Sequence, residues 1–539
     1  MAAPMSTIHV CGSLAKLTNR YDHTLYFDTI AAQARYFDLC SEYEFTDYTF
    51  LRDRWSIKVK ARHNNAREWT YLFFDNYPDG VTWHKRYYYF ITRVDYISEN
   101  CVELHLEMDV IQTYMFDWKL RPCYVEREHS ETDEIGENTV DEGLEVGDFV
   151  TAAKESINLS DDMMILVAAS IDAPKFYYSG GQTEDKIFAS KYGKIFGGFQ
   201  ITATPMEYWT ELAVMLNYLN TKGKSDTVFT IWQYPSSLIT TSTGDYEDPV
   251  TLYVSGDAIK SHTAQARPKN LDGYVPRNNK LFQNPYCFMY VTNNNGGAAV
   301  YQYERFETDT RVFRIQGNIA PDAVVKLVPT LYKGVTHNFD ESLSVGSFPV
   351  CSWNSDTYKL WLAQNQNQQN LGLAMDGLKI AAGIGAIVAT PATGGVSTAA
   401  GVGLITSGAT GIASQLSQRA DKAIQPPQAR GSYSGSHNVS NGIQGFEIYH
   451  KTIDATHARI IDDFFTMYGY ACRRVKVPNI SSRPAFNYVK TVGSNVTGAI
   501  PQDDLQTINR IFDHGITFWK ETVPNVGDFG NYARTNVPQ

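Results

Sequence analysis

The chain has 539 residues, more than a single hydrophobic core usually supports, so several domains are expected. Hydrophobic residues make up 43% of the chain, charged residues 19% and aromatic residues 13%, a composition typical of a folded, β-rich protein that excludes global disorder. The formal charge of −11 repels phosphate on average and argues against stable nucleic-acid binding.

The first region, to about residue 155, is expected to be a β-barrel or sandwich. Apolar and polar residues alternate from Val102 to Val110, which buries one face of a sheet. The polar residues 98–100 follow an aromatic run and predict the turn of a hairpin. Residues 130–148 are acidic and are expected to form a loop, with a domain boundary near residue 155.

The middle of the chain, residues 156–350, is expected to be a separate domain of short strands. The apolar run 163–169 predicts a buried strand, and residues 293–297 predict a turn. Thr204 and Pro205 have the residue types that begin a helix, and the stripe Leu212, Met215, Leu216 and Leu219 has helical spacing.

The C-terminal region, residues 431–539, has a mixed pattern. Apolar residues from Ile460 to Tyr468 have helical spacing and are followed by Gly469, a plausible helix end. A second helix is predicted after Pro501, followed by a strand at 516–519. The basic residues at 473–476 predict a strand with a charged exposed face, which could meet an acidic neighbouring subunit.

One segment differs from the rest of the chain, because residues 380–418 include no Asp, Glu, Lys, Arg or His over 39 positions. Its two arms, roughly 371–389 and 396–416, are each long enough to cross a membrane as a helix. Small residues recur at every fourth position, which lets helices approach closely in lipid. We therefore predict a membrane-inserting hairpin within a loop spanning residues 351–430.

The aliphatic residues predicted to enter the membrane are Leu371, Leu373, Leu378, Ile380, Ile384, Ile387, Val388, Val396, Val402, Leu404, Ile405, Ile412 and Leu416. The predicted helix-packing residues are Ala381, Gly385, Ala389, Gly403, Ser407 and Gly411, and the predicted turn contains Pro391, Gly394 and Gly395. Only ten of the 39 residues are Val, Ile or Leu, which makes insertion by one copy marginal. A hairpin buried within the protein, or a loop without membrane contact, is the alternative.

The sequence contains none of the patterns that would anchor an enzyme assignment. Phosphate-loop, dinucleotide-binding, zincin and hydrolase-elbow motifs are absent, and the seven cysteines are far apart, without a Cys-x-x-Cys pair. The histidines do not cluster at ligand spacing. We expect no catalytic residue, no cofactor and no metal.

Several collinear segments resemble the tail knob proteins of small podoviruses of the Picovirinae type. These segments are EMDVIQTYMFD at 107–117, VEREH at 125–129, VDEGL at 140–144, DDMM at 161–164, YGY at 468–470, RVKVPN at 474–479, AFNYV at 485–489 and IFDHGIT at 511–517. The resemblance covers roughly residues 50–170 and 360–520, and no such segment is found between about 175 and 350.

The resemblance implies a mainly β fold with some α, in which both chain ends form a β-barrel tube domain and the middle is an inserted lower domain. It also implies a homohexameric ring at the distal end of the virion tail, in contact with other tail proteins. Double-stranded DNA would pass through this ring, and the hydrophobic loops would plug it before inserting in the host cell membrane. The rivals are a receptor-binding or wall-degrading tail tip protein and a plain tube or adaptor without membrane activity.

Overall fold

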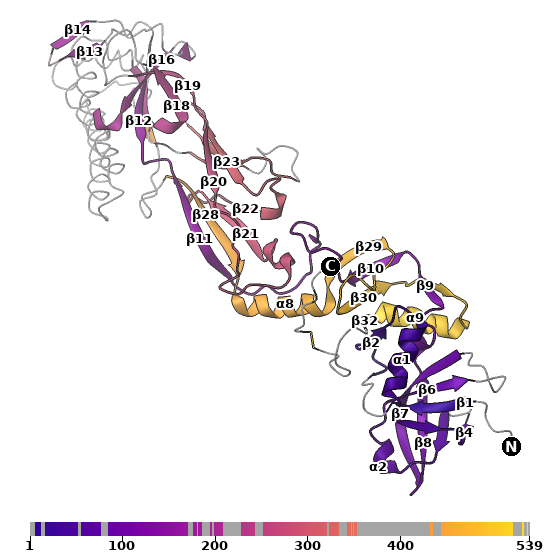
Figure 1. Cartoon of the computed structure of the whole chain (residues 1–539). Coiled ribbons are helices and arrows are strands. Elements are labelled where there is room, and N and C mark those ends of the chain that lie inside the picture. The colour runs from indigo at the N-terminus through magenta and orange to yellow at the C-terminus, as the bar shows by residue number, and fades with distance from the viewer. Residues whose placement is uncertain are drawn as a thin grey trace, which may run out of the picture. The chain divides into compact units, whose positions relative to one another are not determined.

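The structure is a computed structural model. It describes residues 6–11, 17–51, 55–76, 85–170, 176–179, 182–185, 195–196, 199–208, 228–242, 252–320, 323–333, 342–346, 348, 350–352, 432–434, 444–520, 531–532 and 536. The chain forms two compact units. Unit 1 consists of Met1–Phe149, Lys269–Tyr286 and Ile453–Gln539, and unit 2 of Val150–Pro268 and Cys287–Thr452. Strands dominate over helices in the described residues (Figure 1), which confirms the predicted mainly β fold with some α.

Unit 1 contains a seven-stranded antiparallel sheet with the strand order β3-β1-β6-β7-β8-β5-β4. The strands are β1 (Ser6–Val10), β3 (Tyr43–Phe45), β4 (Tyr48–Leu51), β5 (Ser56–Val59), β6 (Tyr71–Asn76), β7 (Lys85–Ser98) and β8 (Cys101–Met108). The predicted hairpin is confirmed, because β7 and β8 are antiparallel neighbours and their last pair, Ser98 with Cys101, flanks the turn.

This sheet curls into a half-barrel, as its connectivity requires. β3 and β4 lie at opposite ends of the strand order, yet only residues 46 and 47 join them. Three Cα–Cα steps span at most about 11 Å, so these two strand ends have to approach each other. Ile8, Leu72 and Leu104 belong to the buried core on one face of the sheet.

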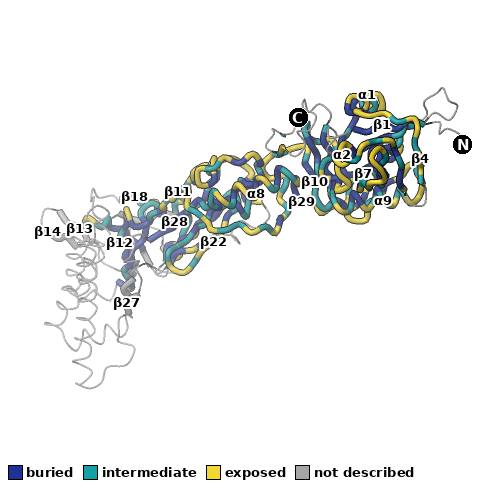
Figure 2. Tube along the Cα trace, turned by 90° about the horizontal axis from the view of Figure 1, so that it is seen from below, coloured by how far each residue is buried: buried dark blue, intermediate teal, exposed yellow. Residues whose placement is uncertain are grey.

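Helix α1 (Ile30–Cys40) packs on the other face of this sheet. Thr29 caps its first turn by accepting a hydrogen bond from the Ala32 backbone N–H at 3.2 Å. The ring of Phe37 lies 5.5 Å from that of Tyr71 and 4.6 Å from that of Tyr88. Figure 2 shows the solvent-facing side of α1 in yellow.

A five-stranded sheet in unit 1 joins distant parts of the chain, in the order β2-β32-β30-β10-β29. Its strands are β2 (Thr24–Tyr26), β10 (Cys123–Glu128), β29 (Tyr470–Lys476), β30 (Phe486–Val492) and β32 (Ile516–Lys520). β10 pairs with both β29 and β30, and β2 runs parallel to β32. Both chain ends therefore contribute to one sheet.

The remaining helices and short strands of unit 1 surround these sheets. They are α2 (His63–Ala66), α3 (Val110–Thr113), β9 (Trp118–Leu120), η5 (Asn279–Phe282), α8 (Ala455–Tyr468), β31 (Val496–Gly498) and α9 (Gln502–His514). The two predicted C-terminal helices are confirmed by α8 and α9, and the strand predicted after the second is β32. The acidic stretch 130–148 contains no helix or strand, as expected of a loop.

Helix α8 ends at a glycine whose backbone conformation and close packing both disfavour a side chain. Gly469 has a φ of 66°, and a Cβ there would collide with the carbonyl oxygen of Glu128. Gly493 has the same φ of 66° and nothing near its missing Cβ. We expect Gly493→Ala to lower the free energy of unfolding by about 1 kcal/mol, from the left-handed backbone alone. Gly469→Ala should cost about 2–3 kcal/mol, because the collision adds to the strain. Equal losses in urea titrations would contradict this.

Unit 2 is built from three larger sheets and a hairpin. A four-stranded sheet has the order β11-β28-β21-β22, a second the order β20-β23-β24-β25, and an eight-stranded sheet the order β18-β19-β16-β12-β17-β26-β27, with β15 paired to β16. The strands of the first two sheets are β11 (Phe149–Asn158), β20 (Lys260–Ala264), β21 (Cys287–Thr292), β22 (Ala298–Tyr301), β23 (Arg311–Gly317), β24 (Val325–Pro329), β25 (Leu343–Val345) and β28 (Gly445–Ile453).

The strands of the eight-stranded sheet are β12 (Met163–Ser170), β15 (Ile195–Phe196), β16 (Phe199–Pro205), β17 (Val228–Pro235), β18 (Ile239–Ser242), β19 (Leu252–Asp257), β26 (Val350–Ser352) and β27 (Ser432–Ser434). The hairpin is β13 (Phe176–Ser179) with β14 (Gln182–Asp185), and the short helices are η2 (Met206–Tyr208), η4 (Ser236–Leu238) and η6 (Tyr303–Arg305). The predicted strand at 163–169 is confirmed by β12, and the predicted turn at 293–297 joins β21 to β22.

One predicted helix start is wrong. Thr204 and Pro205 end strand β16, in which Thr204 pairs with Ile165, and a 3-10 helix follows them. Pairing with β12 outweighs the local preference of these residue types for a helix start. The leucine and methionine stripe at 212–219 lies outside the described residues.

Candidate functional site: a buried polar network in unit 1

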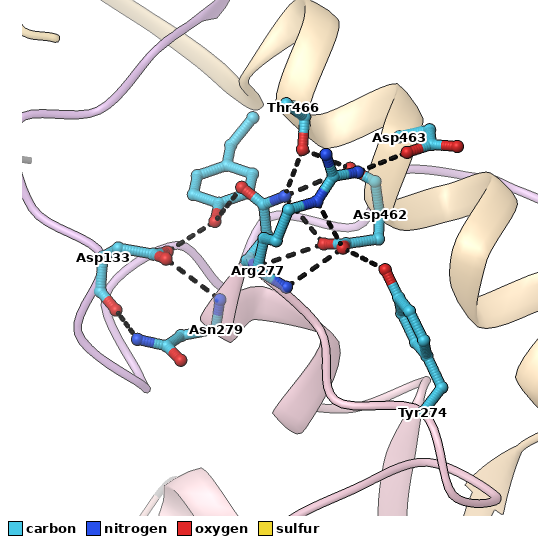
Figure 3. Close-up of polar contacts among 9 residues, drawn as sticks. Asp133, Tyr274, Arg277, Asn279, Asp462, Asp463 and Thr466 are labelled. Carbon is cyan, nitrogen blue, oxygen red and sulfur yellow. Dashed lines mark hydrogen bonds and ion pairs between the residues drawn. The ribbon is translucent and has the colours of Figure 1, made fainter. Parts of the chain in front are cut away.

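The predicted membrane-insertion, helix-packing and turn residues, from Leu371 to Leu416, all lie outside the described residues and stay predictions. No helix in the described part of the chain is long and apolar enough to cross a membrane. No group of metal-ligating side chains in the ranges that the structure describes could hold a metal ion. The most elaborate cluster of charged and polar side chains that we find there is a buried network in unit 1 (Figure 3).

Asp462 on helix α8 is the centre of this network. Its carboxylate is fully buried, and one oxygen accepts hydrogen bonds from the Tyr274 hydroxyl at 2.6 Å, the Arg277 backbone N–H at 3.0 Å and Arg277 Nε at 3.1 Å. The other oxygen accepts from the backbone N–H and the side-chain amide of Asn278 at 3.0 and 2.7 Å. Five donors from residues 274–278 therefore meet one carboxylate.

Asn278 and Asn279 extend the network to the acidic loop. The Asn278 amide donates to Thr466 Oγ1 at 2.9 Å, and the Tyr470 hydroxyl donates to Asp133. Asp133 also accepts the Asn279 backbone N–H at 3.0 Å. Burial raises the pKa of Asp133 above its ordinary value, and the hydrogen bonds from Asn279 and Tyr470 oppose this rise.

Arg277 is partly exposed at the edge of the network and forms ion pairs with two neighbouring carboxylates. It pairs with buried Asp462 and with Asp463, whose side chain is 65% exposed. Burial by itself lowers the pKa of Arg277, but the hydrogen bond and charge of Asp462 outweigh it, so the pKa is raised. Burial and Asp462 together raise the pKa of Tyr274 to about 12. Both donors therefore stay protonated around neutral pH.

Glu142 forms a second buried ion cluster in the same unit. Its side chain is fully buried and pairs with Arg127 and Lys280, and it also accepts the Ala471 backbone N–H at 3.0 Å. Lys280 donates to the Val140 carbonyl at 2.8 Å. Burial lowers the pKa of Lys280, against the opposing effect of Glu142. A buried charge with several partners is costly to leave unpaired.

The two clusters fasten the same three segments, namely the loop at 130–148, residues 269–286 and helix α8 with the start of β29. Residues 269–286 belong to unit 1 although the chain on either side of them belongs to unit 2. Both carboxylate oxygens of Asp462 already accept hydrogen bonds from the protein. This carboxylate is therefore suited to holding segments together and not to proton transfer.

Sequence reasoning missed this network. The acidic stretch 130–148 was predicted only as a loop, and nothing in it indicated that the side chain of Glu142 is buried. Asp141 is exposed and accepts the Gly143 backbone N–H at 3.1 Å, as expected of a loop residue. The available signal was Asp462 between the apolar residues Ile461 and Phe465, on the side of the helix that faces the core.

His129 lies beside the network and provides a pH-dependent test. Its ring is buried, its Nε2–H donates to the Thr466 carbonyl at 3.0 Å, and its Nδ1 accepts the Tyr488 backbone N–H at 2.7 Å. The neutral ring is therefore fully satisfied. Burial lowers the pKa of His129 to about 3.

We expect the stability of unit 1 to decrease as pH falls below about 6.5, because His129 then takes up a proton only in the unfolded chain. Between pH 7.5 and pH 5 this one residue should cost about 2 kcal/mol, and the loss continues toward pH 3. In His129→Asn, which keeps an acceptor near Nδ1, that part of the pH dependence should disappear. Urea unfolding of both proteins at pH 7.5 and pH 5 measures this difference. If the free energy of unfolding falls by the same amount in both proteins, His129 is not the residue responsible.

Comparisons with known proteins cover nearly the whole chain. The family model for the C-terminal domain of tail knob protein gp9 of Bacillus phage phi29 matches residues 253–537, and that for the caudoviral major tail protein N-terminus matches residues 10–119. The first match includes residues 253–350, where no resemblance was found in the sequence.

Curated relatives and a solved structure agree with these models. The chain is 26% identical to tail knob protein gp9 of Bacillus phage B103, over 95% of this chain and 96% of that protein, and 26% identical to that of phage phi29, over 96% of each. The bacteriophage C1 tail knob protein gp12 has a similar fold, with a TM-score of 0.63 at 14% identity and 98% of both chains covered.

Proposed function

The chain belongs to the family of the Bacillus phage phi29 tail knob protein gp9, and from this we propose that six copies form a ring at the distal end of the phage tail. A structural role in the tail, with contacts to other tail proteins, follows from the family. The ring would enclose a conduit through which double-stranded DNA leaves the particle, without sequence recognition. The net charge of −11 supports this role, since an acidic wall does not hold DNA by ion pairs.

We further propose that the hydrophobic loops plug this conduit and then enter the host membrane. The observation that carries this proposal is the uncharged run at 380–418, 39 residues long, in a chain of a tail knob family. Unpaired backbone groups are costly in lipid, so several copies inserting together as helices would share the burial. The ring would deliver the loops together.

The ring is tested by the mass of the purified protein and by its projections in the electron microscope. We expect a hexamer mass and annular particles. A monomer at all accessible concentrations would contradict the ring.

The membrane step is tested with a synthetic peptide covering residues 371–416 and dye-loaded liposomes. We expect dye release, because aliphatic side chains leave water on insertion at a gain of about 25 cal/mol per Å². A peptide of the same length in which Ile384 and Ile405 are glutamate serves as the control. Intact liposomes with both peptides would support a plain tube whose loops only seal it.

A further inference from the structure

An apolar patch lies on the exposed face of the five-stranded sheet in unit 1. Tyr124 on β10 is directly opposite Val475 on β29 and Val492 on β30, and the three side chains are 39%, 70% and 54% exposed. Neighbouring strands are about 4.8 Å apart, so these side chains form a continuous row about 10 Å across. Val477 adds a further exposed side chain beyond β29. Water-facing sheet surfaces are ordinarily polar, so this row indicates a covered surface.

β29 is the last strand in the order of this sheet, but its free edge is not suited to pairing with another strand. Arg473 has a φ of 48°, and the pairing with β10 skips this position, which distorts the edge. Exposed arginines and such distortions are the features by which edges resist strand addition. The contact is therefore expected through the face that bears Tyr124 and Val475.

Arg473 and Arg474 directly precede Val475 on the edge strand β29, and both are exposed. Among the residues that the structure describes, neither has a carboxylate within ion-pairing distance. Two unpaired guanidinium groups next to an apolar row fit a partner with exposed carboxylates around an apolar centre.

The chain itself carries a surface of that kind. Glu42 and Glu44 flank Tyr43 at the edge strand β3, and Asp47 follows in the two-residue connection to β4; all four are exposed. None of the three carboxylates has a basic partner in the described ranges. Within unit 1, β29 and β4 lie well apart in both views (Figure 1, Figure 2), so the two surfaces can engage different neighbours.

We propose that the basic, apolar surface around Val475 of one copy docks on the acidic surface around Tyr43 of a second copy. Contact between two different surfaces is heterologous. Such contacts generate a closed ring when the rotation that relates neighbouring copies adds up to one full turn. The patch would be the dry centre of a larger interface with a charged rim. The inference deepens the proposed ring by naming the surfaces that build it, and it rests on that ring.

Single substitutions test the apolar surface. Val475→Asp is expected to raise the protein concentration needed for assembly about tenfold or more, since a charge would be buried at the contact. Val275→Asp is the matched control, because Val275 is 67% exposed in the same unit and outside the patch. Native mass spectrometry gives the oligomer population, and thermal unfolding confirms that each variant is folded.

Charge reversal tests the pairing of the two surfaces. Arg473→Glu with Arg474→Glu, and separately Glu42→Lys with Glu44→Lys, should each prevent assembly. An equimolar mixture of the two proteins should assemble, with copies alternating around the ring, because each contact then joins opposite charges. A wild-type protein that never assembles would refute the ring itself. A wild-type ring whose variants also assemble, or a mixture that stays dissociated, would refute only these surfaces.

Discussion

Asp462→Ala is expected to lower the free energy of unfolding of unit 1 by about 3–5 kcal/mol. The substitution removes the acceptor of five hydrogen bonds, which come from the Tyr274 hydroxyl, from two N–H groups of Arg277 and from two of Asn278. Buried donors without acceptors cost far more than exposed ones. Thermal unfolding reports the overall loss, and hydrogen exchange should show residues 274–279 opening first.

Asp463→Ala is the matched control for this experiment. Asp463 is the next residue of α8 and also pairs with Arg277, but its side chain is 65% exposed. Exposed ion pairs contribute about 0–1 kcal/mol, so the control should unfold almost as the unchanged protein does. A similar loss in both variants would mean that the helix, and not the buried carboxylate, determines the effect.

Phage particles whose loops carry Ile384→Glu together with Ile405→Glu are expected to assemble normally and to fail in genome delivery. A charge at the centre of a membrane helix costs about 2.5–3.5 kcal/mol, and each copy would carry two. Six copies that insert together multiply this cost, so the loss should be nearly complete. Plaque yield, with DNA release into host cells, measures the effect.

The conservative pair Ile384→Val with Ile405→Val keeps both positions apolar and should preserve delivery. Electron micrographs of the two kinds of particle should show the same tails. Normal delivery by the glutamate variant would contradict membrane insertion and would favour a loop that acts only as a plug. The ring surfaces around Val475 and Tyr43 are tested independently, because their variants leave the loop unchanged.

Elements whose signals lie within a few neighbouring residues were predictable. Helix α8 ends at Gly469, helix α9 follows Pro501, and the alternation after Val102 lies in β8. Each of these patterns depends on the 3.6-residue or two-residue period and on local turn chemistry. Collinear segments also pointed to the tail knob family, which the comparisons confirm.

The polar network was not predictable, because burial of a carboxylate depends on which distant segments meet. Asp462 and its donors are 184–188 positions apart in the chain, and Glu142 and Ala471 are 329 apart. Nothing local distinguishes Glu142 from an exposed acidic residue. The helix start predicted at Thr204 and Pro205 was wrong for the same reason, since Thr204 belongs to a strand only because β12 lies beside it.

By itself, the sequence determined the mainly β class, the helices near the C-terminus, the family and the presence of one long uncharged run. Only the tertiary structure decided that β3 and β4 close a half-barrel, that β10 joins strands from the other end of the chain, and that Asp462 is saturated with donors. Periodicity is a property of neighbouring residues, whereas strand order and the burial of a charge depend on contacts between distant ones.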